Sequence, residues 1–254
     1  MIFCRFRHDG EDRYGIAENH EVREIAQNPF GPYEILDESF AFGEVELLAP
    51  SSPSKIVAVG VNYKAHGEEM NHELPPEPKL FLKPSTAVIG PNDAVIYPKM
   101  ASRVDYEGEL GVVIKSKTKN IEPEQAGEHI LGYTCFNDVT ARDLQKKDGQ
   151  WTRGKGFDTF APIGPWIVSD IDASDLAVET YLNGEMKQSS RTSLMIFKVP
   201  YLVSYISKVI TLLPGDVIAT DTPAGIGPMQ VGDQIDVSIE GIGVLRNIIR
   251  EPAA

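Results

Sequence analysis

Residues 104–114 read Val104-Asp105-Tyr106-Glu107-Gly108-Glu109-Leu110-Gly111-Val112-Val113-Ile114. The second half of this stretch is apolar and rich in β-branched residues, which is typical of a buried strand. Residues two apart in a strand project from the same face, so Glu107 and Glu109 would lie side by side just ahead of the buried part. Two carboxylates at that distance repel each other unless a raised pKa or a cation relieves the repulsion. An exposed strand end with two solvated glutamates is the alternative that the stretch alone leaves open.

Apolar runs of strand length recur on both sides of this stretch. They occupy residues 56–59, 79–82, 94–97, 130–136, 163–168 and 217–220. Residues 176–182 run into Asn183-Gly184, a pair that accepts the positive φ values of a tight hairpin turn. An apolar stripe of helical period predicts a helix over residues 199–213, and shorter helices are expected after Pro123 and Thr140. The pattern predicts an α+β, strand-dominated chain without β-α-β alternation.

The clearest change of composition lies at residues 50–54, Pro-Ser-Ser-Pro-Ser. Proline and serine favour turns and extended linkers. Before this segment, short apolar runs are broken by Gly, Asn and Pro, and they predict a few short strands. We therefore expect a small N-terminal β-rich domain over residues 1–52 and a larger domain over residues 53–254.

The composition excludes several classes of protein. The chain has 254 residues, with 24 Lys and Arg against 37 Asp and Glu, which gives a formal net charge of −13. A surface of that sign repels phosphate backbones, so we expect no nucleic-acid partner. No run of about 20 apolar residues is present and charge interrupts the first residues, so we expect neither a membrane partner nor a signal peptide. Two cysteines, Cys4 and Cys135, are too few for a disulfide framework, which favours a cytoplasmic protein.

A third acidic residue, Asp138, follows the apolar run 130–136. Carboxylates that meet at strand ends, with no thiol nearby, suit a hard divalent cation such as Mg²⁺ or Mn²⁺, and Ca²⁺ shares this preference for oxygen. Glu107, Glu109 and Asp138 are therefore the candidate metal ligands. Asp138 also precedes a predicted helix start, and capping of that helix by its side chain is the competing interpretation.

His66 and Glu69 lie three residues apart in a polar stretch between two predicted strands. One turn of helix would bring the imidazole and the carboxylate into contact. A glutamate beside a histidine holds the ring and raises its basicity, which is the arrangement needed to take a proton from water. The simplest interpretation of the whole stretch is an exposed flexible loop, in which the two residues would form a surface salt bridge.

Four further residues are candidates for ligand contacts. Lys155 lies between two glycines, which allow close approach of the backbone to a ligand. Arg142 and Gln145 lie one turn apart just after the third acid, and Thr222 belongs to a loop, residues 221–227, whose amides could bind a carboxylate. Taken singly, each of these residues is more often part of a turn or a surface charge. The glycine-rich phosphate-binding motifs are absent from the sequence, so a nucleotide is not implied.

Six segments of the chain resemble, in the same order, segments of the fumarylacetoacetate hydrolase family. They are Asn62-Tyr63 with His66 and Glu69-Met70, then Phe81-Leu82-Lys83-Pro84-Ser85, residues 103–110, residues 136–145, Lys155-Gly156-Phe157-Asp158-Thr159-Phe160, and Thr222-Pro223-Ala224-Gly225-Ile226-Gly227. The resemblance runs from about Lys55 to Gly243. It implies that residues 53–254 form a catalytic domain of mixed β-sandwich roll type, usually within a homodimer.

The resemblance also implies a role for each candidate residue. Glu107, Glu109 and Asp138 would bind Mg²⁺ or a similar ion, His66 and Glu69 would activate water on a lid that orders over the substrate, Lys155 would orient a ketone or enolate oxygen, and Arg142, Gln145 and Thr222 would hold carboxylate or carbonyl groups. The chain departs from the family at Asp221, where a glycine commonly stands. This departure brings an additional carboxylate beside the loop that would bind an anion.

The implied reaction is hydrolytic cleavage of a C–C bond in an acylpyruvate or related 2,4-dioxo acid, through an enolate that the metal stabilises. The substrate would be a small dicarboxylate or 2-oxo acid. Isomerisation of a 2-hydroxyhepta-2,4-diene-1,7-dioate and decarboxylation of an oxaloacetate-like acid pass through the same enolate and stay open as alternatives. The retained His66–Glu69 pair favours hydrolysis. A non-catalytic scaffold with a structural metal is the remaining alternative, and the retained histidine and lysine argue against it.

Overall fold

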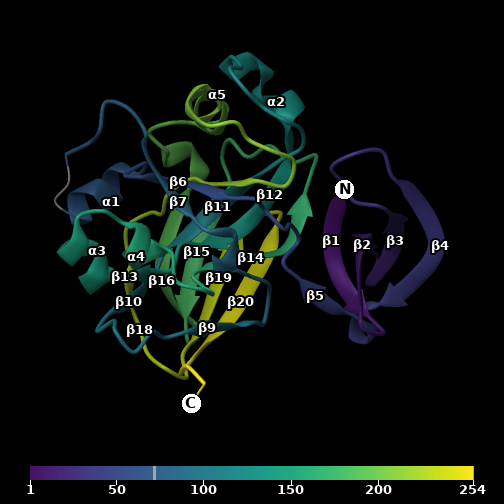
Figure 1. Cartoon of the computed structure of the whole chain (residues 1–254), viewed down its shortest axis with the longest axis horizontal. Coiled ribbons are helices and arrows are strands. Elements are labelled where there is room, and N and C mark those ends of the chain that lie inside the picture. Colours follow the sequence, from purple (N-terminus) through teal and green to yellow (C-terminus); the bar gives the residue numbers. More distant parts are fainter. Residues whose placement is uncertain (71–72, 254) are drawn as a thin grey trace.

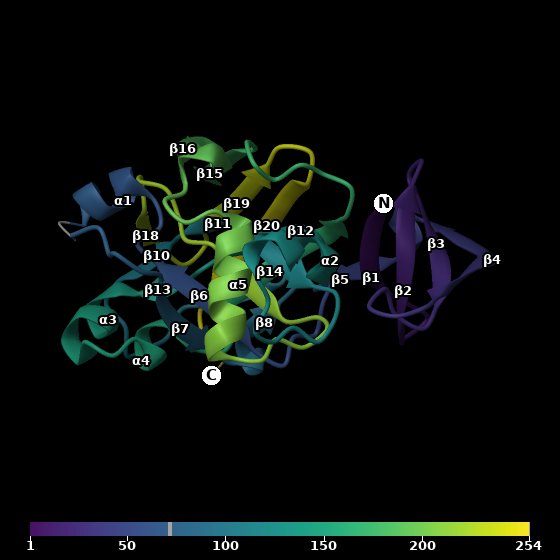
Figure 2. The same cartoon turned by 90° about the horizontal axis from the view of Figure 1, so that it is seen from above.

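The computed structural model describes residues 1–70 and 73–253, and it consists of a small β unit beside a larger body of packed sheets (Figure 1). The small unit holds the N-terminal strands and lies at one end of the long axis in two perpendicular views (Figures 1 and 2). The larger body carries the helices and the C-terminal strands, and strands dominate it as the sequence predicts. In the described part of the chain, no helix is both long enough and apolar enough to cross a membrane.

The N-terminal unit is an antiparallel meander of four strands followed by a short fifth. β1 spans Ile2–His8, β2 Glu11–Glu18, β3 Glu21–Ala26, β4 Glu34–Ala41 and β5 Glu46–Leu48. β5 returns to pair with β1, and Phe6 and Val22 are buried inside the unit. β1 also pairs with β14 (Ala161–Val168) of the larger body. The expected short strands are confirmed, while a domain boundary at residue 52 stays a prediction.

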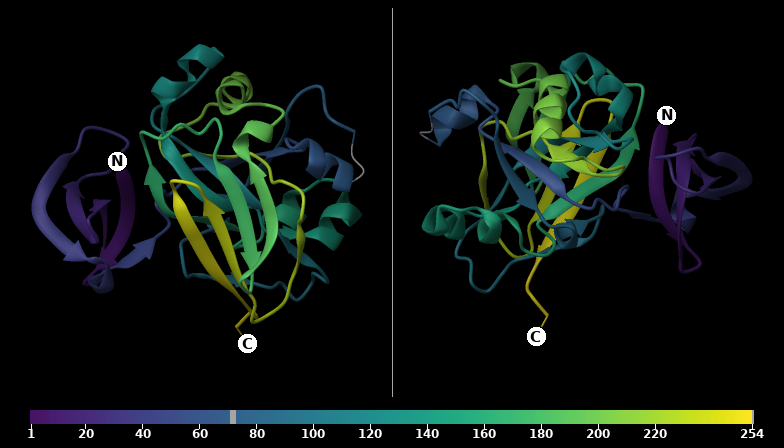
Figure 3. Two further views of the ribbon diagram at one scale, coloured as in Figure 1. Left: turned by 180° about the vertical axis from the view of Figure 1, so that it is seen from behind. Right: turned by 45° about the horizontal axis from the view of Figure 1, so that its top comes forward.

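A mixed sheet forms the centre of the larger body, and a second sheet covers one of its faces (Figure 3). Beyond β14 the central sheet continues, in spatial order, with β12 (Ile130–Asn137), β11 (Gly108–Ile114), β17 (Val217–Ala219), β6 (Ile56–Gly60) and β7 (Lys79–Lys83). The second sheet has the order β16 (Glu185–Arg191), β15 (Ala177–Leu182), β19 (Gln234–Ile239), β20 (Gly243–Arg250) and β9 (Ala94–Ile96). Leu110, Val112 and Ile114 of β11 pack in one core cluster with Val178 and Leu245 of the second sheet. This packing confirms the predicted mixed β-sandwich.

Shorter elements complete the larger body. They are α1 (Lys64–Glu69), β8 (Val88–Ile89), β10 (Val104–Tyr106), α2 (Ala126–His129), β13 (Thr140–Ala141), α3 (Arg142–Asp148), α4 (Thr152–Lys155), α5 (Val199–Val209) and β18 (Gly227–Met229), with 3-10 turns at Phe42–Glu44, Ser85–Ala87, Pro123–Gln125 and Thr192–Leu194. β13, β10 and β18 form a third, small sheet. α1, α3 and α4 gather at the end of the larger body that faces away from the N-terminal unit (Figures 1 and 2).

Two local predictions are confirmed. The Asn183-Gly184 turn joins β15 to β16 with φ angles of 53° and 81°, the positive values that such a turn requires. The short helices expected after Pro123 and Thr140 are α2 and α3. In both cases the signal is local, because a few adjacent residues determine the backbone conformation.

The long helix is shorter than the apolar stripe predicted. α5 ends at Val209, whereas the stripe extends to Leu213, which is 39% exposed. The chain becomes extended at Ile210 because the next residues pair with another segment. Leu212 and Thr118 exchange backbone hydrogen bonds of 3.0 and 2.9 Å. A long-range contact therefore ends the helix before Pro214 does.

The expectation of an exposed loop between β6 and β7 is wrong for the first part of that stretch. Residues 64–69 form helix α1, and His66 and Gly67 are buried. Residues 71–72, which belong to the segment that the resemblance implies is a lid, lie outside the described residues.

The Pro-Ser segment before β6 is packed against the larger body. Asp216, fully buried just before β17, accepts hydrogen bonds from the Ser54 amide at 3.0 Å, the Ser54 hydroxyl at 2.7 Å and the Lys55 amide at 3.2 Å. The ammonium of Lys55 forms an ion pair with the same carboxylate, and the amide of Leu213 donates to it at 2.8 Å. A single carboxylate thus ties the segment to β17.

Replacing Asp216 with alanine is expected to lower the free energy of unfolding by about 3 kcal/mol, because several amide and hydroxyl groups lose a charged acceptor in the interior. Chemical denaturation measures the loss. Asp175→Ala, which removes an exposed ion pair with Arg191, is the matched control and should leave the midpoint almost unchanged. Equal shifts in the two variants would contradict the role assigned to Asp216.

Candidate active site

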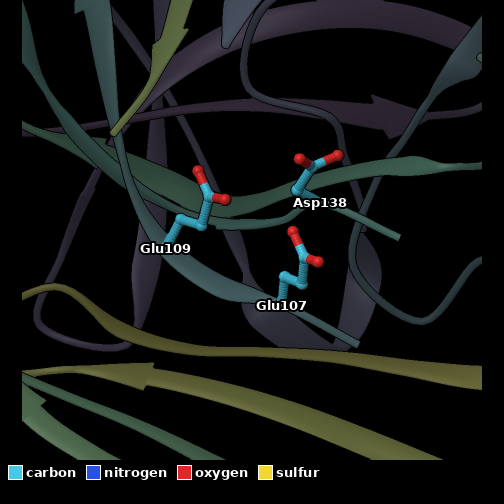
Figure 4. A group of neighbouring side chains, drawn as sticks. All are labelled: Glu107, Glu109 and Asp138. Carbon is cyan, nitrogen blue, oxygen red and sulfur yellow. The ribbon is translucent and has the colours of Figure 1, made fainter. Parts of the chain in front are cut away.

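The three predicted acids meet at one edge of the central sheet. β11 and β12 are antiparallel neighbours with Gly108 opposite Asn137, so the start of one strand and the end of the other lie together. Asp138 follows β12, and its amide donates to the carbonyl of Glu107 at 2.9 Å. Glu107, Glu109 and Asp138 each offer an oxygen within 4.8 Å of the others (Figure 4). The expected convergence of the carboxylates is found, and their role as ligands stays a prediction.

The backbone reaches this convergence differently from the single strand that the sequence suggested. β10 ends at Tyr106 and β11 begins at Gly108, so Glu107 lies in a break between them. The Glu107 amide donates to the side chain of Asn137 at 3.0 Å instead of continuing a strand ladder. Because of this break, β10 pairs with β13 and β18 in the third sheet, while Glu107 still lies beside Glu109.

Three cationic side chains surround the acids. Lys155 of α4 donates to Glu107 at 2.6 Å and to Asp138 at 2.5 Å, and Lys83 of β7 is paired with the other oxygen of Asp138. Arg142 of α3 is paired with Glu107. The Asp138 carboxylate therefore pairs with the ammonium groups of Lys155 and Lys83 and does not cap α3. The interpretation of Glu107 and Glu109 as solvated residues at an exposed strand end is wrong, because both are at most 3% exposed.

The acids differ in how their charge is compensated. Burial raises the pKa of Glu107, but Lys155 and Arg142 outweigh it and hold that pKa below its ordinary value. Burial raises the pKa of Glu109 well above its ordinary value, and Asp138, Asp221 and Glu107 raise it further. Oε1 of Glu109 is buried with no hydrogen-bond partner among the described residues. An all-oxygen set with an unpaired, buried carboxylate oxygen fits a hard divalent cation.

His66 and Glu69 meet within α1, as one turn of helix predicted. Nδ1 of His66 lies 3.3 Å from Oε2 of Glu69, and Oε1 of Glu69 accepts the amide of Gly225 at 3.1 Å. His66 is only 7% exposed. The two side chains pair on a helix with the histidine buried and Glu69 exposed, so the interpretation as a surface loop is wrong, while the salt bridge itself is present.

These residues border one cavity of about 350 Å³. His66, Glu69, Glu107, Arg142, Gln145, Lys155 and Asp221 line it, together with Lys146 and the aromatic rings of Phe81 and Trp151. Arg142 donates to Asp105 at 2.9 Å and to Gln145 at 2.7 Å, so protein acceptors hold its guanidinium in the cavity wall. Of the predicted site residues, only Glu109, Asp138 and Thr222 do not line this cavity.

Thr222 is near this cavity without lining it. Its hydroxyl donates to the carbonyl of Gly108 at 2.9 Å and accepts the Gln188 amide at 2.8 Å. Asp221, the residue before it, lines the cavity instead, and burial raises its pKa to about 6. The contact predicted for Thr222 therefore stays a prediction, and its side chain has a structural function in holding the start of β11.

Sequence reasoning assigned no role to two groups that shape the site. Lys83 is fully buried, although lysine is rarely buried without a partner, and burial lowers its pKa. In the sequence, the burial of Lys83 is indicated only by its position at the end of an apolar strand. Trp151 closes the cavity wall against Gly60, where an added Cβ would come within 2.8 Å of the indole ring. This contact gave no signal, because it joins residues far apart in the sequence.

Comparison with known proteins agrees with this geometry. The family described as fumarylacetoacetate (FAA) hydrolase, C-terminal, matches residues 55–250, and the one described as Rv2993c-like, N-terminal, matches residues 1–50. The chain belongs to the fumarylacetoacetate hydrolase family. It is therefore a family enzyme that acts as a hydrolase, an isomerase or a decarboxylase of 2-oxo acids.

Individual members of the fumarylacetoacetate hydrolase family are similar over nearly the whole chain. Protein Rv2993c of Mycobacterium tuberculosis is 50% identical over 94% of this chain and 91% of its own length. The 2,4-didehydro-3-deoxy-L-rhamnonate hydrolase of a Sphingomonas species is 36% identical over 99% of this chain and 96% of its own. The crystal structure of 2-hydroxyhepta-2,4-diene-1,7-dioate isomerase from Mycobacterium marinum has a TM-score of 0.94 at 46% identity and covers 100% of both chains. The relatives' names thus include two reaction classes on one fold.

If the three acids hold a divalent cation such as Mg²⁺, replacing Glu109 with glutamine is expected to abolish its binding and keep the fold. Because the folded-state pKa of Glu109 is raised, stability is lost as the pH rises from the ordinary pKa of glutamate up to the raised folded-state pKa. At pH 8 the metal-free variant should unfold at the same or a higher temperature than the metal-free native protein. Only the native protein should gain stability from added Mg²⁺.

Thermal unfolding in Mg²⁺ or EDTA measures both effects. Glu179→Gln, a change on the second sheet outside the cavity, is the control and should respond to Mg²⁺ as the native protein does. An equal gain from Mg²⁺ in E109Q would show that the ion binds elsewhere.

Proposed function

We propose that this chain is a hydrolase that depends on a divalent cation and cleaves a C–C bond in an acylpyruvate or a related 2,4-dioxo acid. The proposal rests on one observation above all: the His66–Glu69 pair, the acid Glu107 and Lys155 border the same cavity. Hydrolytic cleavage needs a base for water, positive charge near the departing enolate and a way to hold a 2-oxo acid. All three requirements have candidate residues here.

Glu107, Glu109 and Asp138 would hold the cation, and we propose Mg²⁺ because hard oxygen ligands suit it. When bound, it would supply positive charge beside the carboxylate and keto oxygens of a 2-oxo acid, where negative charge develops as the bond to the adjacent carbon breaks. Mn²⁺ and Ca²⁺ prefer the same kind of ligand, so the choice among them is part of the proposal.

His66 would take the proton from water. Its Nδ1 faces Glu69, so Nε2 is the nitrogen that accepts the proton, and the glutamate stabilises the imidazolium that forms. The Gly225 amide holds the other oxygen of Glu69 and so keeps the pair oriented. The activated water would attack the distal carbonyl of the acylpyruvate.

Lys155 would oppose negative charge on the keto oxygen. Burial disfavours the charged ammonium, but Asp138 and Glu107 outweigh it and raise the pKa of Lys155, so the side chain is a cation at neutral pH. Arg142 and Gln145 would contact the substrate's carboxylate from the cavity wall, and Thr222 would contribute through its loop. The homodimer that the resemblance implies is likewise part of the proposal.

Isomerisation of a 2-hydroxy-dienedioate is the second candidate, favoured by the similarity to the 2-hydroxyhepta-2,4-diene-1,7-dioate isomerase from Mycobacterium marinum. Both isomerisation and decarboxylation would use the three acids and Lys155, but neither needs His66 to activate a water molecule. The buried, paired state of His66 favours hydrolysis over both. A purely structural metal site would not require a histidine and a lysine in the same cavity.

A turnover screen separates these reactions. Purified protein with Mg²⁺ would be offered acetylpyruvate, fumarylpyruvate, oxaloacetate and a 2-hydroxy-2,4-dienedioate, with EDTA as the control and product analysis as the readout. Cleavage of an acylpyruvate that EDTA abolishes is the expected result. Tautomer exchange alone would indicate an isomerase, and CO₂ from oxaloacetate alone a decarboxylase.

Replacing His66 with asparagine is expected to reduce acylpyruvate hydrolysis by about a hundredfold or more, the usual effect of losing a general base. Mg²⁺ affinity should stay within about threefold, because the acids are untouched. Oxaloacetate decarboxylation should fall much less, because no water is activated in it. Calorimetry and the two rate assays measure these effects, with His129→Asn, outside the cavity, as the matched control. Equal losses in both reactions would remove the base role from His66.

A further inference from the structure

Two residues that are not glycine adopt left-handed backbone conformations beside the cavity. Val61 follows β6 with a φ of 60°, and Asp221 follows the end of β17 with a φ of 78°. Positive φ is rare for residues with a Cβ and most unfavourable for β-branched ones. Such conformations persist where the surrounding contacts over-determine them, often at functional sites. Both residues line the cavity.

A short path of hydrogen bonds connects these two positions to the acids. The carboxylate of Asp221 accepts the amide of Asn62, the neighbour of Val61, at 2.5 Å. The amide of Asp221 donates to Oε2 of Glu109 at 3.0 Å. Asp221 therefore bonds to a candidate metal ligand, Glu109, through its backbone amide, and to Asn62, two residues before α1, through its side chain.

Asn62 is fully buried, and all its polar groups are bonded. Its side-chain amide donates to the carbonyls of Thr220 and Phe197, both at 3.0 Å, and its side-chain oxygen accepts the Phe197 amide at 2.6 Å. Its own carbonyl accepts the amide of Ile196 at 2.7 Å. These hydrogen bonds fix the position of Asn62, which lies two residues before α1.

α1 depends on such outside contacts for its position. It has six residues, too few for a helix that is stable alone, and its N-cap residue Tyr63 makes no side-chain cap. At its far end Glu69 accepts the amide of Gly225, from the same loop that carries Asp221. The loop after β17 therefore holds α1 at both ends.

We propose that Asp221 is a positioning residue for the His66–Glu69 pair: its carboxylate holds Asn62, and so the start of α1, at a set place relative to Glu109. The inference rests on the proposed function, in which His66 takes a proton from water. Glycine would adopt the φ of 78° without strain. This chain has a strained aspartate instead, whose carboxylate supplies the acceptor for Asn62.

Asp221→Gly and Asp221→Asn separate the side-chain bond from the backbone. Glycine relieves the strain and keeps the amide that bonds Glu109, but it removes the acceptor for Asn62. Asparagine keeps an acceptor oxygen of the same size without the charge. Hydrogen exchange at the amides of Gly67 and Met70, which bond within α1, reports on the helix without any substrate.

In D221G we expect these two amides to exchange about tenfold faster or more, the factor for losing one hydrogen bond to a charged acceptor. Hydrolysis should lose about tenfold or more in kcat with KM within about twofold, because the base is misplaced and substrate contacts persist. Mg²⁺ affinity should stay within about threefold. D221N should recover most of the exchange protection and of kcat.

Unchanged exchange and kcat in D221G would overturn the proposal, and so would a rise in KM alone, which indicates a substrate contact. Equal loss of Mg²⁺ binding in D221G and D221N would also overturn it, because a charge near the cation would then be the role. Asp9→Gly is the matched control, an exposed aspartate at a φ of 50°, and should change nothing. If the native protein hydrolyses no acylpyruvate, the proposed function fails, while the exchange rates still decide whether Asp221 holds α1.

Discussion

Mutual repulsion among three buried carboxylates is the constraint around which this structure is arranged. Glu107, Glu109 and Asp138 converge where water is largely excluded, so their charge must be met by the protein or by an ion. The chain brings a cation from β7, another from α3 and a third from α4 to the same point. Elements far apart in the sequence are thereby committed to one edge of the central sheet.

The site consists of two parts with different mechanical support. The acids lie at the ends of long, paired strands in the core, whereas His66 and Glu69 lie on a six-residue helix held by loop contacts. A change that moves α1 would shift His66 and Glu69, the pair proposed to activate water, and leave the acids in place.

Local patterns predicted much of this arrangement, and long-range contacts account for the differences. The strand spacing of Glu107 and Glu109, the helical spacing of His66 and Glu69, and the Asn183-Gly184 turn were readable because neighbouring residues determine them. The end of α5 was not, because Thr118 determines it across the fold. The burial of Lys83 and the anchoring of Ser54 and Lys55 by Asp216 were also hidden, since in both cases the paired residues are more than 50 residues apart in the sequence.

β6 and β17 run parallel with Ile56 opposite Val217 and Ala58 opposite Ala219. An aspartate joins them beyond each end: Asp216 binds Ser54 at one, and Asp221 binds Asn62 at the other. These two contacts fix how far β6 and β17 extend relative to each other at both ends. Over evolution, an insertion or deletion in either strand would break one of these contacts unless the other strand changed equally, so we expect homologues that keep both aspartates to differ here by substitution alone.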